Sequence, residues 1–277
     1  MGDGPAIGRL DATGASKTLI GPGLAEPTLA GPAGFVLRWR RVDGPCVVPA
    51  APGQAVVHVG LSGRVHTRDG SHLGPRDVRI AAVGEVLQGR GELLELVYPG
   101  VAYGPRAWRF GATAPLRTRV PLRWAPTEVL DLLSPRDLYP VVGPVQYGPG
   151  RFALQGPPGL VVVLAHTPRG TGPALHVHTQ STEMFVVLGG RFRVFWGDHA
   201  EDGVELGPLD HIVVPTGLPR GFTALTDDAW ILPVVVGVAD EREDILWPPA
   251  VVAQLERVAP PGLVPLMRRL GLRLAAR

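Results

Sequence analysis

Residues 170–190 contain a His-x-His pair followed by an acid, and this run constrains the fold of the chain more than any other. His176 and His178 stand two residues apart, so on a β-strand both rings point to the same face. Glu183 follows at the start of the apolar run Met184–Leu188, which fits a second strand. Two imidazoles and one carboxylate that converge from paired strands are ligands suited to Fe, Mn, Ni, Zn or Cu. The run therefore predicts a metal site within β-structure.

The glycine and proline content indicates a chain of many short strands. The 277 residues include 37 Gly and 30 Pro, which fall between short runs rich in Val and Leu. Strands joined by tight turns of this kind are typical of sandwiches and barrels. With 45% apolar and 19% charged residues, the chain has the composition of a folded soluble protein. We expect an all-β fold, and the chain is long enough for two cores.

Charge and cysteine usage exclude several functional classes. The formal net charge is only +2 and the arginines are scattered among acids, so we expect no nucleic-acid partner. No apolar run reaches the roughly 18–20 residues of a membrane span, and residues 1–30 lack the pattern of a signal peptide. We therefore expect a cytoplasmic protein with no membrane partner. Cys46 is the single cysteine, which excludes a disulfide framework and a thiolate cluster.

Turn residues divide the chain into two blocks of strands with flanking segments. Helical spacing occurs at Glu128–Leu133, at Ala250–Val258 and at Leu263–Leu274. We expect the basic C-terminal helix to pack on its own barrel or on a second subunit, which leaves a homodimer open. The acidic run Asp240–Asp244 is expected to be solvated surface. The predicted parts are a flexible arm at 1–34, a first barrel at 35–110, a linker with a short helix at 111–140, a second barrel at 141–240 and a helical tail at 241–277.

A short repeat indicates that the two blocks share one strand order. Leu73–Asp77 reads LGPRD and Leu206–Asp210 reads LGPLD, an agreement at four of five positions with an offset of 133 residues. Upstream, Gly63 and Gly190 open corresponding strands at an offset of 127 residues, so the second copy has a hairpin six residues longer. Two copies of one strand order predict two similar barrels in one chain.

The run at 170–190 resembles the first sequence motif of the cupin superfamily. That motif is glycine-x5-His-x-His-x4-Glu-x6-glycine, and its fixed positions are occupied by Gly170, His176, His178, Glu183 and Gly190. Together with the repeat, this resemblance implies a bicupin, in which two double-stranded β-helix (jelly-roll) barrels lie in one chain.

The second cupin motif is degenerate in this sequence. Pro215 and Gly217 match it, but Arg220 stands where the family has the histidine that completes the metal site. A guanidinium stays protonated and does not ligate a metal. Two arrangements follow from this. Either the three ligands form an open 2-His-1-carboxylate face with Arg220 directed at the substrate, or Arg220 pairs with Glu183 and takes the place of the metal.

The first barrel is expected to have lost its ligands. In register with the motif, Gln54 takes the carboxylate position, and Val47 and Pro49 take the two histidine positions. The first barrel would then have a structural role. The other histidines of this block are expected to be solvated strand-edge or turn residues: His58, His66 and His72.

The cupin resemblance implies an enzyme that acts on a small organic molecule in the second barrel. A metal held by His176, His178 and Glu183 would be iron in the first place, with manganese, nickel, zinc or copper as alternatives. It would support a dioxygenase-like oxidoreductase reaction, which we place in bacterial secondary metabolism. The predicted catalytic residues are Arg220 and Glu183. The predicted substrate contacts are Arg220, His166, Phe185, Phe222 and Trp196.

Two other functions remain open at this point. The first is a metal-independent cyclase, isomerase or lyase that uses Arg220 and Glu183 as its acid, base and oxyanion-binding groups and has no cofactor. The second is a non-catalytic protein in which the same barrel only binds a small molecule.

Overall fold

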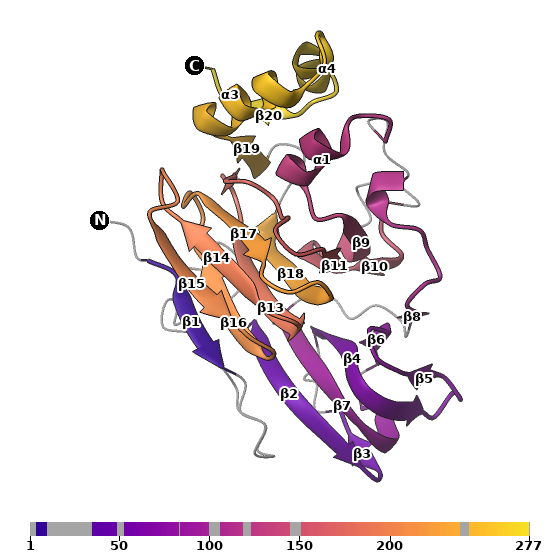
Figure 1. The fold of residues 1–277 in the computed structure, drawn as a ribbon. Coiled ribbons are helices and arrows are strands. Elements are labelled where there is room, and N and C mark those ends of the chain that lie inside the picture. Colours follow the sequence, from indigo (N-terminus) through magenta and orange to yellow (C-terminus); the bar gives the residue numbers. More distant parts are fainter. Residues whose placement is uncertain are drawn as a thin grey trace.

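The computed structural model of the chain describes residues 4–9, 35–48, 53–82, 84–99, 106–118, 123–144, 151–238 and 244–276. Within these ranges the chain forms two β-barrels that lie against each other, with short helices at the far end of the second barrel (Figure 1). The all-β prediction is therefore confirmed. No helix in the described ranges is long and apolar enough to cross a membrane.

The first barrel is built on two long strands, β4 (Gln54–Thr67) and β7 (Val86–Pro99), which pair along most of their length. Strand β4 passes through a register shift between Gly60 and Ser62 without leaving the sheet. The sheet order is β2-β7-β4-β6-β8. Its other strands are β2 (Val36–Asp43), β3 (Cys46–Val47), β5 (His72–Leu73), β6 (Val78–Ala81) and β8 (Arg106–Trp108).

The second barrel consists of a seven-stranded sheet and a three-stranded sheet that enclose an apolar core, which includes Phe185, Phe192, Ile212 and Phe222. The large sheet has the order β1 (Ala6–Arg9), β16 (Asp210–Val214), β13 (Thr182–Gly189), β18 (Ala229–Val238), β11 (Gly159–Thr167), β9 (Asp137–Pro144) and β10 (Leu154–Gly156). The small sheet has the order β15 (Asp202–Leu206), β14 (Phe192–Trp196) and β17 (Arg220–Ala224).

A shared apolar core joins the two barrels. Leu37 and Trp39 alternate with arginines along β2, so one face of that strand is apolar and buried. They belong to the same cluster as Val162 and Leu164 on β11 of the second barrel. Each barrel thus covers an apolar sheet face of the other, which would be an exposed patch if the barrel stood alone.

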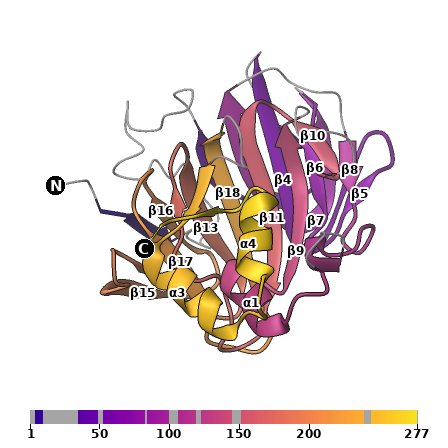
Figure 2. The same ribbon diagram turned by 90° about the horizontal axis from the view of Figure 1, so that it is seen from above.

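A cap of helices and short strands covers one end of the second barrel (Figure 2). Apolar side chains from its helices pack together around Trp247 and Leu175. The last helix ends at Arg269 rather than continuing to Leu274, because Gly271 has a positive φ of 91° and the chain turns there into a short strand. The cap comprises η1 (Leu116–Thr118), α1 (Thr127–Leu133), β12 (Val177–His178), β19 (Ile245–Trp247), α3 (Pro249–Val258), α4 (Leu263–Arg269) and β20 (Arg273–Leu274).

Two equivalent turns confirm the sequence repeat. In both Leu73–Asp77 and Leu206–Asp210 the aspartate carboxylate accepts a hydrogen bond from the glycine N–H three residues earlier, at 2.9 Å in the first barrel and 2.8 Å in the second. The residue before each aspartate has a positive φ, 69° at Arg76 and 67° at Leu209, a conformation that non-glycine residues rarely adopt. The same unusual turn therefore joins equivalent strands in both barrels, β5 to β6 in the first and β15 to β16 in the second.

Strand pairing corrects the predicted register of the first barrel. The offset of 133 residues between the two turns makes Ala81 equivalent to Val214. Val56 pairs with Ala81, and Glu183 pairs with Val214, so Val56 rather than Gln54 occupies the carboxylate position. The error of two residues came from counting back from Gly60, because Gly63 is the glycine that corresponds to the closing glycine of the motif. Val56 is buried and apolar, and it offers no metal ligand.

Three other boundaries differ from the prediction. Residues Ala6–Arg9 of the predicted flexible arm form strand β1, which pairs with β16 of the second barrel, while residues 10–34 lie outside the described part of the chain. Strand β9 begins at Asp137, inside the predicted linker. The longer hairpin of the second copy contains strand β15, because cross-strand pairing with β14 overrides the weak strand propensity of this segment.

The interior of the first barrel contains a buried ionic cluster, which corrects the prediction that His58 is solvated. His58 and Glu95 are both fully buried, and His58 Nε2 lies 3.3 Å from Glu95 Oε2. Arg40 donates to both carboxylate oxygens, at 2.8 and 3.0 Å. In strand register, His58 corresponds to Phe185 in the core of the second barrel. The first barrel thus contains at its centre a buried carboxylate whose two oxygens are both paired.

We predict that Glu95→Gln lowers the free energy of unfolding by about 3 kcal/mol, because it removes one partner of a buried charge pair. Burial alone would raise the pKa of Glu95, but His58 and Arg40 outweigh it and lower the pKa to about 2. The stabilisation is therefore complete above the unfolded-state pKa near 4.5 and is lost as the pH falls toward 2. Urea unfolding between pH 7 and pH 3 should show a smaller difference between the two proteins at low pH, and a constant difference would contradict the account.

Candidate metal centre

Three side chains from adjacent strands meet at one end of the second barrel. His178 lies on β12 and Glu183 on β13, and His176 precedes β12 and bridges to Arg220 on β17 through two backbone hydrogen bonds. Glu183 Oε2 is 3.7 Å from His176 Nε2 and 3.3 Å from His178 Nε2. All three side chains are buried, and their ligand atoms lie within 4.8 Å of one another. The structure thus brings together the three predicted ligands.

The Nδ1 atoms of both imidazoles make hydrogen bonds that leave the Nε2 atoms available for a metal. His176 Nδ1 lies 3.0 Å from the carbonyl oxygen of Ala174, which only accepts hydrogen bonds. His178 Nδ1 lies 2.6 Å from Asp244 Oδ2. Each Nδ1 therefore donates a hydrogen bond, and each Nε2 faces Glu183 as the nitrogen that would bind a metal. The buried Glu183 Oε2 accepts no hydrogen bond from the described residues, and this donor set of two nitrogens and one oxygen fits a divalent transition metal.

The electrostatics of the site favour the ligand forms of these residues. Burial would raise the pKa of Glu183, but the two histidines and Arg220 outweigh it and hold the pKa at about 2. Burial lowers the pKa of His176, so its ring is neutral near pH 7. A carboxylate and a neutral imidazole are the protonation states that coordinate a metal.

Arg220 pairs with Glu183 rather than facing the substrate space. Its Nε lies 3.3 Å from Glu183 Oε2, its Nη1 donates to the carbonyl oxygen of Leu218 at 2.8 Å, and the side chain is fully buried. Desolvation by burial lowers the pKa of Arg220, while the charge of Glu183 raises it. Of the two arrangements expected for this arginine, the ion pair is the one that the structure contains. Arg220 and a metal would share the charge of one carboxylate.

A cavity of about 230 Å³ opens beside the triad. Its walls are apolar apart from the triad and Ser134, and the cap supplies part of them through η1, α1 and β19. Phe185 and Phe222 line the cavity, as predicted for substrate contacts, and their rings meet edge to face with centroids 5.3 Å apart. The other lining residues are Leu116, Leu133, Pro135, Leu138, Val161, Val163, Pro173, Pro233, Val235, Ile245 and Trp247.

The structure places the remaining predicted contacts away from this cavity. His166 lies 3.0 Å from Asp137 and its ring is 4.8 Å from that of Trp230, in the shared core region between the barrels. Trp196 is at the end of β14, opposite Arg220, and packs against the barrel core. Neither these two side chains nor Arg220 belong to the described lining of the cavity. A position near the end of a strand was not enough to predict which side of the barrel a side chain faces.

Sequence reasoning missed the residues that come from the cap. Asp244 was expected on a solvated surface, but it is fully buried against His178 and Ser181. Trp247 lies with its ring 5.3 Å from that of His176. No local spacing could have found Asp244, because 66 residues separate it from His178. The sequence signal that could have indicated burial of Asp244 is its position directly before an apolar segment, since the last acid of an acidic run can be buried with that segment.

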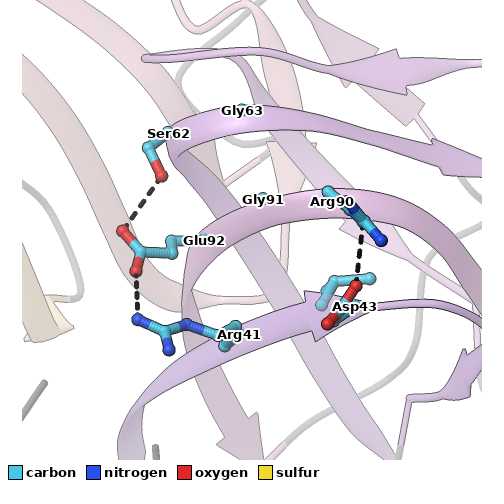
Figure 3. Close-up of a pocket in the computed structure, with 8 residues that line it drawn as sticks. Arg41, Asp43, Ser62, Gly63, Arg90, Gly91 and Glu92 are labelled. Atoms are coloured by element: carbon cyan, nitrogen blue, oxygen red, sulfur yellow. Dashed lines mark hydrogen bonds and ion pairs between the residues drawn. The ribbon is translucent and has the colours of Figure 1, made fainter. Parts of the chain in front are cut away.

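A second, larger cleft lies on the first barrel and contains no comparable ligand set among its described residues. Figure 3 shows its charged side chains, which pair across the cleft: Arg41 and Ser62 both contact Glu92, and Arg90 contacts Asp43. The cleft has a volume of about 460 Å³. Surface ion pairs of this kind contribute little to stability, and they leave no group directed at a ligand.

We predict that Arg220→Gln raises the affinity of the site for zinc at least about tenfold, because it removes a positive charge that opposes a divalent ion over a few ångströms. Chelator competition on the purified proteins measures this. Arg191→Gln, which changes an exposed arginine paired with Glu205, is the matched control and should leave the affinity unchanged. A folded Arg220→Gln protein that binds zinc no better than the unchanged protein would contradict the prediction.

Comparisons with known proteins bear on the fold. No family model matches the sequence, and no curated protein matches it. Among solved structures, salicylate 1,2-dioxygenase from Pseudoaminobacter salicylatoxidans with gentisate is 12% identical with a TM-score of 0.53, over 92% of this chain and 84% of that one. YhhW from Escherichia coli is 12% identical with a TM-score of 0.50, over 77% and 85% of the two chains. The bacterial pirin YhhW in complex with nickel(II) gives a TM-score of 0.51 at 10% identity, over 74% and 82%. At these identities the likeness concerns the fold alone, and it shows that the chain shares the fold of the salicylate 1,2-dioxygenase and of YhhW.

Proposed function

We propose that this protein is a metal-dependent cupin oxidoreductase of the dioxygenase type that acts on a small organic molecule in the second barrel. The observation that carries the proposal is the arrangement of His176, His178 and Glu183, whose ligand atoms converge at the wall of an apolar cavity. Three ligands leave positions open beside that cavity, as in the 2-His-1-carboxylate sites of non-haem iron enzymes. We further propose that the protein is cytoplasmic and that it can form a homodimer.

Each side chain has a distinct part in this reaction. A bound divalent metal supplies a Lewis acid and, with iron, a centre for reaction with dioxygen. The two histidines and Glu183 would hold it, and the cap and barrel walls would surround the substrate. Arg220 holds the Glu183 carboxylate in place from the side away from the cavity, which makes it a positioning residue rather than a substrate contact. Phe185 and Phe222 present aromatic surface for an apolar part of the substrate.

The cavity favours a compact and uncharged substrate. Its volume of about 230 Å³ is below the roughly 300–1,000 Å³ typical of sites for drug-sized ligands. The described lining residues include no arginine or lysine, so the charge of a carboxylated substrate would be balanced by the metal alone. We therefore favour an uncharged aromatic or alicyclic molecule with an oxygen atom that faces the triad.

The ion pair between Arg220 and Glu183 favours a second candidate function. If this pair takes the place of the metal, the neutral His176 beside it would accept a substrate proton as general base and return it as general acid in a metal-independent cyclisation, isomerisation or elimination. A protein that only binds its small molecule would use the same cavity without turnover. Metal analysis separates the first proposal from both of these.

We predict that protein expressed with supplemented iron retains close to one equivalent of metal, measured by elemental analysis after desalting. His176→Ala should remove most of it, because the site loses one of three ligands. His199→Ala changes an exposed histidine of the β14–β15 hairpin and serves as the matched control. Less than about 0.2 equivalents of any transition metal in the unchanged protein would reject the metalloenzyme.

We also predict that cobalt-loaded protein binds catechol at least about tenfold more tightly than salicylate, because a buried and unpaired carboxylate is costly in an apolar cavity. The visible spectrum of the cobalt reports both ligands. Val163→Phe, which narrows the cavity without touching the triad, should abolish both responses while the cobalt spectrum persists. Tighter binding of salicylate would contradict the assignment of an uncharged substrate.

A further inference from the structure

A strand near the C-terminus is attached directly to β12, the strand that carries the candidate ligand His178. Strand β19 pairs with β12, with Leu246 opposite Val177 and Ile245 opposite His178. Asp244 immediately precedes β19, and its carbonyl oxygen accepts hydrogen bonds from the Thr179 backbone N–H and side-chain hydroxyl, at 2.8 and 3.0 Å. The register of this pairing therefore fixes where the Asp244 side chain enters the barrel.

The Asp244 carboxylate is fully buried against the ligand strand. Its Oδ2 lies 2.6 Å from His178 Nδ1 and also accepts a hydrogen bond from the Ser181 hydroxyl. Its Oδ1 accepts a hydrogen bond from the backbone N–H of Gln180 at 2.7 Å. Both oxygens of the Asp244 carboxylate therefore have hydrogen-bond partners, and they lie on the Nδ1 side of His178, away from Glu183. Burying a carboxylate is costly unless it is paired in this way.

These contacts determine the geometry of one metal ligand. The carboxylate accepts a hydrogen bond from His178 Nδ1, which leaves Nε2, 3.3 Å from Glu183, as the nitrogen that would bind a metal. A carboxylate partner also makes the imidazole a stronger donor than a carbonyl partner does, and His176 has only the carbonyl oxygen of Ala174. The two histidines are therefore held unequally, one by the barrel loop and one by the cap.

We propose that Asp244 is a positioning residue of the metal centre, and that the C-terminal segment is in this way a working part of the site. This inference rests on the proposed function, since it assumes that the triad binds a metal. The cap reaches the other histidine as well, because Trp247 of the same strand packs on the ring of His176. Trp247 in turn belongs to the apolar cluster of α1, α3 and α4, which anchors β19.

The test measures zinc affinity by chelator competition in the full-length protein, together with the visible spectrum of the cobalt-loaded form. Asp244→Ala should weaken zinc binding about 10- to 100-fold and alter the cobalt spectrum. Asp244→Asn keeps a hydrogen-bond acceptor for Nδ1 without the charge, so it should weaken binding less than Asp244→Ala. Ser181→Ala removes only the neighbour of the carboxylate and should have the smallest effect. The matched control is Glu95→Gln, which changes a buried carboxylate paired with a histidine in the other barrel and should lower the melting temperature with unchanged zinc affinity.

The outcomes separate the inference from the function on which it rests. If the unchanged protein binds neither zinc nor cobalt, both the proposed function and the role of Asp244 are wrong. If the unchanged protein binds zinc, and both Asp244→Asn and Asp244→Ala bind zinc as tightly as it does with the same cobalt spectrum, Asp244 has only a structural role. In that case the inference alone is overturned. If Asp244→Ala does not fold, the same comparison is made with Asp244→Asn and Ser181→Ala. A graded loss of affinity in the order Ser181→Ala, Asp244→Asn, Asp244→Ala supports the inference.

Discussion

The buried carboxylate of Glu183 is the group on which the second barrel depends. It lies in a mostly apolar interior, where a charge persists only if opposite charge or strong donors surround it. Two imidazoles and one guanidinium approach its Oε2 within 3.3–3.7 Å, yet that oxygen accepts no hydrogen bond from the described residues. A divalent ion would supply the missing partner and turn a costly cluster into a coordination site.

Each barrel buries a glutamate carboxylate beside histidine and arginine side chains, but the two carboxylates are stabilised differently. In the first, Glu95 is fully satisfied by His58 and Arg40, and the centre of the barrel is closed by that ion pair. In the second, Phe185 takes the strand position of His58 and Pro233 takes that of Glu95, and the charged cluster lies instead at the capped end, next to a cavity. One strand order with one unusual turn therefore supports a barrel closed by an ion pair and a barrel with a charged cluster beside a cavity.

The sequence predicted the parts of this structure that depend on local spacing. The His-x-His pair predicted the ligand set, and the matched LGP turns predicted the two barrels. Both features depend on residues that are neighbours in the sequence. Arg220 was located correctly in the motif, but the direction of its side chain depends on packing. Asp244 could not be found, because its contact with His178 arises from pairing between strands far apart in the chain. Gln54 was misplaced because a short motif does not fix register, which cross-strand pairing does.

The central claim is that His176, His178 and Glu183 bind one metal ion with their Nε2 and carboxylate atoms. X-ray absorption spectroscopy of the zinc-loaded protein tests this most directly. The account predicts two imidazole ligands with Zn–N distances of about 2.0–2.1 Å, together with an oxygen ligand at a similar distance. A spectrum with oxygen ligands alone, or with the imidazole signal unchanged in His176→Ala, would show that the metal is bound elsewhere and would contradict the account.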